Sequence, residues 1–265
     1  MNSIKKLVVI SRVSLTNALA YRVTIATRFV FFTLFLYVFM SLWRTIYADG
    51  SLNGYGYAQI VWYLMVTEFI SFLIGGEFYT TINDEVKSGA IAYQLGRPVH
   101  YVLYQFATTL GQIVVNALSF GSLAVILGFA FAGPLPTFRI EGLPAFLLSM
   151  LLSVVMQFFI LMLIGLSAFV FEDNYGLFLI YQKLCFMLGM LLPVEFLPAW
   201  LQPIAKALPF SYVYWAPAGI LVNYQPGAAL AILARQVAWA VAAVALTLTL
   251  ICYRQCVKGL QINGG

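Results

Sequence analysis

The residues of this sequence that could do chemistry are a few polar side chains inside long apolar runs. Glu68, Glu77 and Lys183 carry charge there, and three amides share the same runs, namely Gln112, Asn116 and Gln157. A charge at the centre of a bilayer costs roughly 3 kcal/mol on insertion scales, so it needs a partner or water and marks a candidate pathway. We therefore expect Lys183 to face Glu68 or Glu77. Hydrogen bonding of each residue to backbone or water near the end of a span is the alternative.

Sequence patterns for catalysis or nucleotide binding are absent. The chain holds neither a GxxxxGK[ST] phosphate loop nor a GxSxG nucleophile motif, and its single histidine, His100, excludes an HExxH zinc site. Cys185, Cys252 and Cys256 lack metal-ligand spacing and are expected to be small apolar fillers. We expect no enzymatic activity, metal or cofactor in this chain.

The composition identifies the solvent that surrounds the chain. Apolar residues make up 63% and charged residues 9% of it, whereas a soluble domain carries about 25% charged residues. The apolar runs are continuous and lack the alternation of an outer-membrane barrel, so the sequence predicts an all-α membrane protein. The net charge of +5 is modest and is interpreted through membrane topology, and no nucleic-acid partner is expected.

About six membrane spans are predicted, because a helix needs about 20 apolar residues to cross a bilayer. Their ranges are 23–43, 58–76, 102–131, 143–171, 177–193 and 229–253. With the N-terminus inside, most basic residues lie on the cytoplasmic side: Lys5, Lys6, Arg12, Arg22, Lys87, Arg97, Arg254 and Lys258. Four lie on the other side: Arg44, Arg139, Lys206 and Arg235. We expect a single transmembrane domain over residues 1–265 in the cytoplasmic (inner) membrane, with both termini cytoplasmic.

Residues 3–20 have apolar side chains at helical spacing. Lys5, Lys6 and Arg12 fall largely on the other face, which is typical of a helix that lies in the membrane interface. The alternative is that this segment forms the first part of a long first span.

The polar link between the second and third spans predicts a short helix over residues 83–97. Asn83 can cap it, acidic residues suit its first turn, and an Arg-Pro pair after a glycine ends it. It is either an ordinary loop that orients the protein or a docking element for a cytoplasmic partner. Its candidate docking residues are Asp84, Glu85, Lys87, Gly89, Arg97 and Pro98.

Residues 193–217 stay apolar after the fifth span but contain five prolines: Pro193, Pro198, Pro203, Pro209 and Pro217. Prolines prevent a long helix, and aromatic residues such as Trp200 favour the membrane interface. We expect a pair of short re-entrant helices in the outer leaflet, shielded by neighbouring spans. Glu195 within them is either part of a gate or a solvated residue at the outer mouth.

Two stretches carry a family resemblance: VKSGAIAYQLGRPVHYVLYQ at 86–105 and PVEFLPAWLQPIAKALPFSYVYWAP at 193–217. In this order they resemble an ABC-2-type transporter permease, the transmembrane subunit of an ABC exporter. More narrowly, the chain is similar to small six-span permeases of drug-export and antibiotic-resistance systems. The run Ala-Ile-Ala-Tyr that follows Gly89 departs from the family, because many relatives carry a more acidic and aliphatic run there.

The resemblance implies roles for three segments. Residues 3–20 would be the interfacial connecting helix, residues 83–97 the coupling helix in a groove of a separate ATPase subunit, and residues 193–217 the re-entrant helices closing the outer side. ATP and Mg would bind that cytoplasmic ABC ATPase, and a second permease chain, identical or homologous, would complete a dimer in the lipid bilayer. The exported substrate would be amphiphilic, drug-like or lipid-linked.

Two other classes of function remain open. An ion-gradient-driven secondary transporter should show inverted repeats and paired acidic residues at mid-membrane, whereas no convincing repeat is found and Glu68 is the single candidate carboxylate. A membrane scaffold would instead use residues 83–97 to dock a cytoplasmic partner that is not an ATPase.

Overall fold

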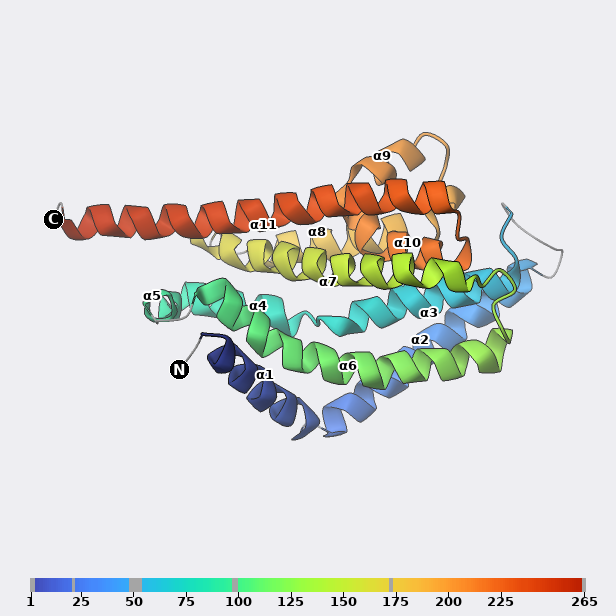
Figure 1. Cartoon of the computed structure of the whole chain (residues 1–265), viewed down its shortest axis with the longest axis horizontal. Coiled ribbons are helices and arrows are strands. Elements are labelled where there is room, and N and C mark those ends of the chain that lie inside the picture. The colour runs from blue at the N-terminus through green and yellow to red at the C-terminus, as the bar shows by residue number, and fades with distance from the viewer. Residues whose placement is uncertain (1–2, 21, 48–53, 97–99, 172–173, 264–265) are drawn as a thin grey trace.

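The helices of this protein run mostly along one axis (Figure 1). The computed structural model describes residues 3–20, 22–47, 54–96, 100–171 and 174–263, and within these residues every regular element is a helix. The main helices are α1 (Ser3–Ala20), α2 (Arg22–Ile46), α3 (Tyr57–Leu73), α4 (Glu77–Lys87), α5 (Ala90–Leu95), α6 (Tyr101–Ala132), α7 (Leu143–Leu166), α8 (Tyr175–Cys185), α9 (Gln202–Ala207), α10 (Pro209–Val222) and α11 (Pro226–Asn263). The predicted all-α architecture is confirmed.

Five segments of the described residues are long and apolar enough to cross a membrane: Ile25–Ile46, Tyr57–Lys87, Tyr101–Ala132, Ile140–Phe169 and Pro226–Cys252. The predicted fifth span, 177–193, is instead a shorter apolar helix, Tyr175–Met190, whose last turn is a π-helix. Pro193 lies just beyond this helix, and a proline, which lacks an N–H donor, cannot extend it. The expectation of about six full spans therefore becomes five long segments and one short one.

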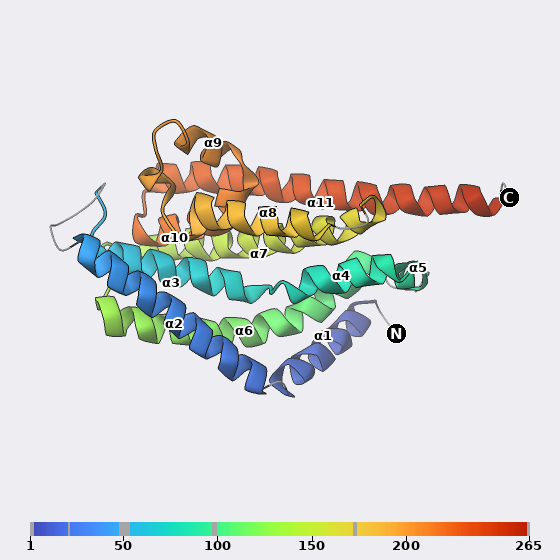
Figure 2. The ribbon, with the colours of Figure 1, turned by 180° about the vertical axis from the view of Figure 1, so that it is seen from behind.

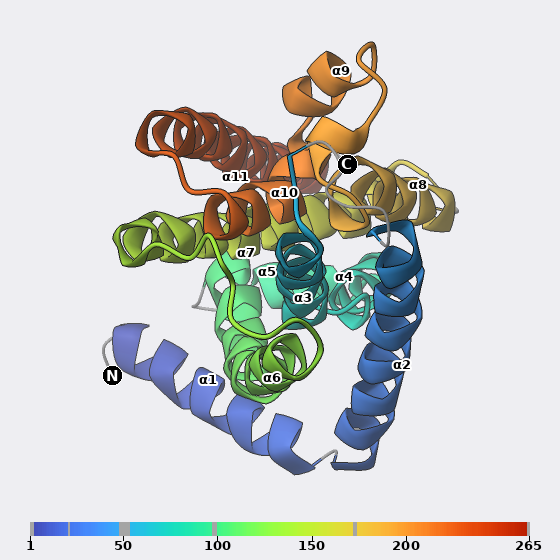
Figure 3. The ribbon, with the colours of Figure 1, turned by 90° about the vertical axis from the view of Figure 1, so that its right-hand side faces the viewer.

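Helix α3 is the centre of the bundle. Viewed along the long axis, α2, α6, α7 and α10 surround it (Figure 3), and it contacts all four. Most of its residues from Ile60 to Leu73 are buried, because the helix is apolar on every face. From behind, α2 runs obliquely across α3 and α6 at the periphery (Figure 2).

A break at residues 74–76 separates α3 from α4. It frees backbone carbonyls inside a membrane-crossing segment, where an unsatisfied carbonyl costs several kcal/mol. Two side-chain amides satisfy them: Asn116 Nδ2 on α6 donates to the carbonyls of Phe72 (2.9 Å) and Leu73 (3.3 Å), and Gln157 Nε2 on α7 donates to that of Ile74 (3.2 Å). Both amides, expected from the sequence only to be polar residues within spans, thus hold the broken helix in place.

Helix α1 confirms the predicted helix at 3–20 and packs against α6. Ser11 Oγ donates to the carbonyl of Ala107 (2.9 Å), and Ser14 Oγ donates to that of Thr108. The two backbones meet at Gly111, where a Cβ atom would lie 2.5 Å from the backbone nitrogen of Leu15. That α1 lies in the membrane interface stays a prediction.

The α1–α6 contact predicts that Gly111→Ala destabilises the protein. The added methyl group would clash with backbone atoms that cannot rotate away, and overpacking of this kind costs about 1–3 kcal/mol. Thermal unfolding in detergent should show a lower midpoint. Gly176→Ala on α8 is the matched control, because no atom lies within 4 Å of the added Cβ; an equal effect of both substitutions would contradict the close contact.

Candidate functional site

Features of interest gather at both ends of the bundle. Figure 1 shows helix α5 and both termini toward one end, which we call the α5 end, and the start of α3 with the connections before α7 and α11 at the other, which we call the loop end. Helix α9 lies outside the bundle toward the loop end (Figure 1). A cavity lies between these ends, among α2, α3, α7, α8 and α10.

The predicted helix at 83–97 is wrong in its limits. Asn83 does not cap a helix but lies buried inside α4, which begins at Glu77 directly after the break. The apolar residues Phe78, Ile82 and Val86 recur every four residues and bury one face of α4, so the helix starts a full turn and a half earlier. Gly89 then adopts φ 75°, a left-handed conformation suited to glycine, and separates α4 from α5.

The α4–α5 hairpin is held to the bundle through Glu85. Its Oε2 atom accepts hydrogen bonds from Tyr101 Oη (2.6 Å) and Gln105 Nε2 (2.8 Å), both on α6. Of the other candidate docking residues, Asp84, Lys87 and Gly89 are exposed, whereas Arg97 and Pro98 lie outside the described residues. Glu85 is therefore in a position to fix α4 against α6.

Helix α5 is short and turns two apolar residues toward the bundle. Its Ile91 is buried, and together with Leu95 it faces Leu166, Phe169 and Ile251 across a small apolar cavity of about 140 Å³. The neighbouring Tyr93 is 72% exposed at the α5 end. The hairpin thus presents an exposed aromatic side chain on a helix whose apolar residues face the end of α7 and Ile251 of α11 across this cavity.

The proline-rich segment folds into short helices, as expected. Its elements are a 3-10 turn at Val194–Phe196, then α9 and α10. Pro209 is the first residue of α10, where a missing N–H costs nothing. Helix α10 continues through Pro217 to Val222, beyond the predicted end at 217, and is buried against α3 and α7. Pro193 and Pro198 flank the 3-10 turn, and Trp200 is 69% exposed.

Glu195 links the parts of this segment. Its Oε2 atom accepts hydrogen bonds from Trp215 Nε1 (3.1 Å) and Tyr55 Oη (3.4 Å), and its Oε1 atom lies 3.7 Å from Lys206 Nζ. Burial, and then the charge of Glu195, raises the pKa of Tyr55, so its hydroxyl stays a donor. One carboxylate therefore ties α9, α10 and the segment before α3 together at the loop end.

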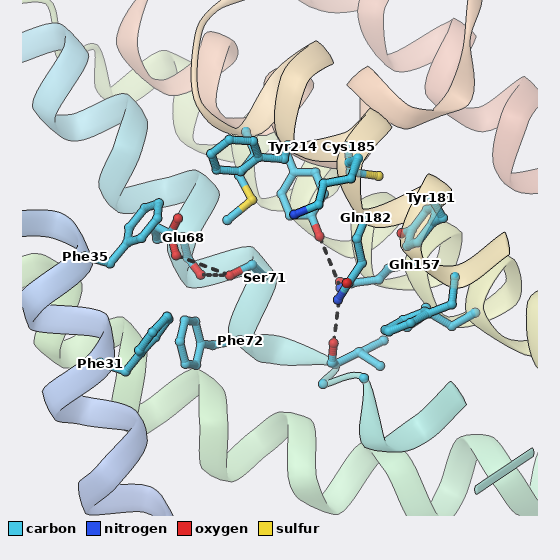
Figure 4. Close-up of a pocket in the computed structure, with 18 of the residues that line it drawn as sticks. Phe31, Phe35, Glu68, Ser71, Phe72, Gln157, Tyr181, Gln182, Cys185 and Tyr214 are labelled. Carbon is cyan, nitrogen blue, oxygen red and sulfur yellow. Dashed lines mark hydrogen bonds between the residues drawn. The ribbon is translucent and has the colours of Figure 1, made fainter. Parts of the chain in front are cut away.

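The cavity among α2, α3, α7, α8 and α10 measures about 360 Å³ and contains Glu68 (Figure 4). Glu68 is 3% exposed, and Ser71 Oγ donates to its backbone carbonyl (2.8 Å) and to its Oε2 atom (3.5 Å). On the opposite wall, Gln157 Nε2 also donates to Tyr214 Oη (3.5 Å). Aromatic rings form much of the remaining lining: Phe31, Phe35, Phe72, Phe178, Tyr181 and Phe186.

The charged residues pair differently from the sequence expectation. Among the described residues, Glu77 Oε1 forms its ion pair with Arg28 Nη2 at 3.0 Å, and Gln112 Nε2 donates to Glu77 Oε2 at 3.4 Å. Lys183 lines the same cavity as Glu68 but forms no ion pair with it or with Glu77 within the described part of the chain. Arg28 was not predicted as the partner of Glu77, although its position inside a predicted span signalled that this basic residue needs an acidic partner.

These features define an all-helical integral membrane protein with a broken central helix and a largely aromatic cavity that contains a buried carboxyl group. A family model described as ABC-2 family transporter protein matches residues 30–264. The chain therefore belongs to the ABC-2 transporter family and is the permease of an ABC transporter, a system with a membrane part and an ATPase partner. No curated protein matches the sequence.

The Glu195 contacts predict a graded response to substitution. Glu195→Ala removes every acceptor from Trp215, Tyr55 and Lys206 and should lower the thermal unfolding midpoint in detergent. Glu195→Gln keeps one oxygen acceptor and should lower it less, because the half-exposed ion pair with Lys206 contributes at most about 1 kcal/mol. If Glu195→Ala, Glu195→Gln and Lys206→Met all lower the unfolding midpoint equally, the prediction is wrong. The ion pair, and not the hydrogen bonds, would then make the main contribution of Glu195 to stability.

Proposed function

We propose that this chain is the membrane subunit of an ATP-driven exporter. ATP and Mg²⁺ bind a separate cytoplasmic ATPase, since the sequence has no phosphate loop of its own. The observation that carries the proposal is α5, a short helix that presents an exposed side chain, Tyr93, at the end of the bundle. Membership of the ABC-2 family supports the same reading.

Helix α5 docks the ATPase, and α4 passes the movement to the spans. Three contacts support this route: the Glu85 hydrogen bonds to α6, the stacked rings of Phe78 and Phe158 (4.8 Å between centroids), and the approach of Ile82 to Gly165 on α7. Because α4 is packed on two spans, a push on α5 moves rigid elements instead of bending a loop. Asp84, Lys87 and Gly89 are the exposed residues of the docking surface, and Arg97 and Pro98 are predicted to extend it.

The α5 end faces the cytoplasm of a cell whose inner membrane holds the protein. Both termini lie toward that end, and α1, with Lys5, Lys6 and Arg12, follows the positive-inside rule (Figure 1). The segment organised by Glu195 then faces the outside and closes the cavity there. When this segment opens, the substrate is exposed to the outer leaflet.

A second permease chain, identical or homologous, completes the transporter. The cavity reaches the surface of this chain, since it is lined by exposed Phe31 on α2 and exposed Gln182 and Lys183 on α8. A second chain facing α2 and α8 would close that side. The substrate is amphiphilic, drug-like or lipid-linked, because aromatic rings outnumber charges in the cavity, and export of such compounds would confer drug resistance.

The proposal predicts that the tagged chain, extracted from native membranes in a gentle detergent, brings an ABC ATPase subunit with it. Tyr93→Ala should reduce ATPase recovery at least about tenfold, because truncation of a central aromatic residue typically costs 2 kcal/mol or more at an interface. Trp200→Ala is the matched control, since it removes an exposed aromatic residue at the opposite end. Mass spectrometry identifies the partners, a second permease included.

Two results would count against the proposal. Recovery of the chain alone at full yield would favour an ion-gradient-driven transporter, and recovery of a partner that is not an ATPase would favour a scaffold. Equal losses of ATPase with Tyr93→Ala and Trp200→Ala would show that α5 is not the specific docking element.

A further inference from the structure

The cavity holds two buried oxygen acceptors that the described residues leave without a donor. Glu68 Oε1 and Gln157 Oε1 both line it, each side chain is 3% exposed, and neither atom accepts a hydrogen bond within the described part of the chain. A buried acceptor without a partner costs about 1–3 kcal/mol. Both oxygens are thus free to accept a hydrogen bond from a molecule that enters the cavity.

No basic side chain of the cavity serves as that donor. Arg28 is engaged with Glu77 at 3.0 Å, and Lys183 is exposed at the end of α8 and pairs with neither acidic residue among those described. Glu68 is thus a carboxyl group in a membrane span without a protein cation beside it. Such a residue is a functional site by default in a membrane protein.

The walls around these acceptors suit a positive charge on an apolar body. Figure 4 shows Glu68 among the rings of Phe31, Phe35 and Phe72, with Gln157 and Tyr181 across the cavity. The faces of aromatic rings attract ammonium groups, more strongly where water is scarce. The volume of about 360 Å³ is within the range of pockets that hold small organic ligands.

We propose that this cavity binds amphiphiles that carry a protonated amine. The ammonium N–H groups donate to Glu68 Oε1, and the apolar part lies against the aromatic wall toward α2. Lys183, at the exposed edge, repels a second positive charge, so the preferred ligand has a single amine at one end. That these amines are also the exported substrates rests on the proposed function; their binding does not.

The test uses the purified permease in lipid nanodiscs, without an ATPase, and a fluorescent probe, a dansyl group joined to a primary alkylamine. Its N-acetylated counterpart has the same body and no charge. We expect the amine to bind at least tenfold more tightly than the acetylated probe, and Glu68→Gln to abolish that difference. Glu141→Gln removes an exposed carboxylate outside the cavity and should leave the difference intact.

A competition experiment on the unmodified protein keeps the test valid if Glu68→Gln does not fold. A long-chain alkylamine should displace the probe, whereas an alkyl carboxylate of equal chain length should not. Equal displacement by the amine and the carboxylate would show that the cavity recognises the alkyl chain alone, and this would overturn the inference. Stronger displacement by a zwitterion of that length would overturn it in favour of a ligand that also uses Lys183.

The outcomes separate this inference from the proposed function. Failure of amine binding in a chain that still co-purifies with an ABC ATPase would refute the amine specificity alone. Amine binding by a chain that has no ATPase partner would leave the binding site and refute the ATP-driven exporter.

Discussion

The structure depends on how it satisfies the broken backbone at residues 74–76. Within a bilayer no water is available to pair the carbonyls that the break frees, so other side chains must donate to them. Asn116 from α6 and Gln157 from α7 do so, at 2.9–3.3 Å. Those bonds fix α3 between α6 and α7 and set where α4 begins.

The same break creates both proposed working parts. It directs α4 toward α5, where Glu85 and the Phe78–Phe158 stack hold it to two spans. It also places Gln157 so that one atom supports the broken helix while the other, Oε1, faces the cavity with Glu68. Gln157 therefore both supports the broken helix and lines the cavity.

Much of this arrangement could be predicted from the sequence, because composition and apolar run length directly report helices in lipid. The helix at 3–20, the short helices after Pro193 and the family followed from such local signals. The start of α4 could not be predicted from local signals. Asn83 is a good cap in isolation, and only packing on α7 extends the helix back to Glu77. The ion pair between Glu77 and Arg28 could not be predicted either, because the two residues are 49 positions apart in the chain and only the fold brings them together.

The central claim is that an ATPase moves the spans through α5, and a distance measurement tests it most directly. Spin labels would be placed at Ala92 on α5 and Leu118 on α6, both exposed, in the permease–ATPase complex in bilayers. ATP binding should change the distance between labels at Leu118 and Leu151 on α7, because the movement of α4 reaches the spans. The Ala92–Leu118 distance should change less, because Glu85 fixes α4 against α6. A Leu118–Leu151 distance that is the same with and without ATP would contradict the account.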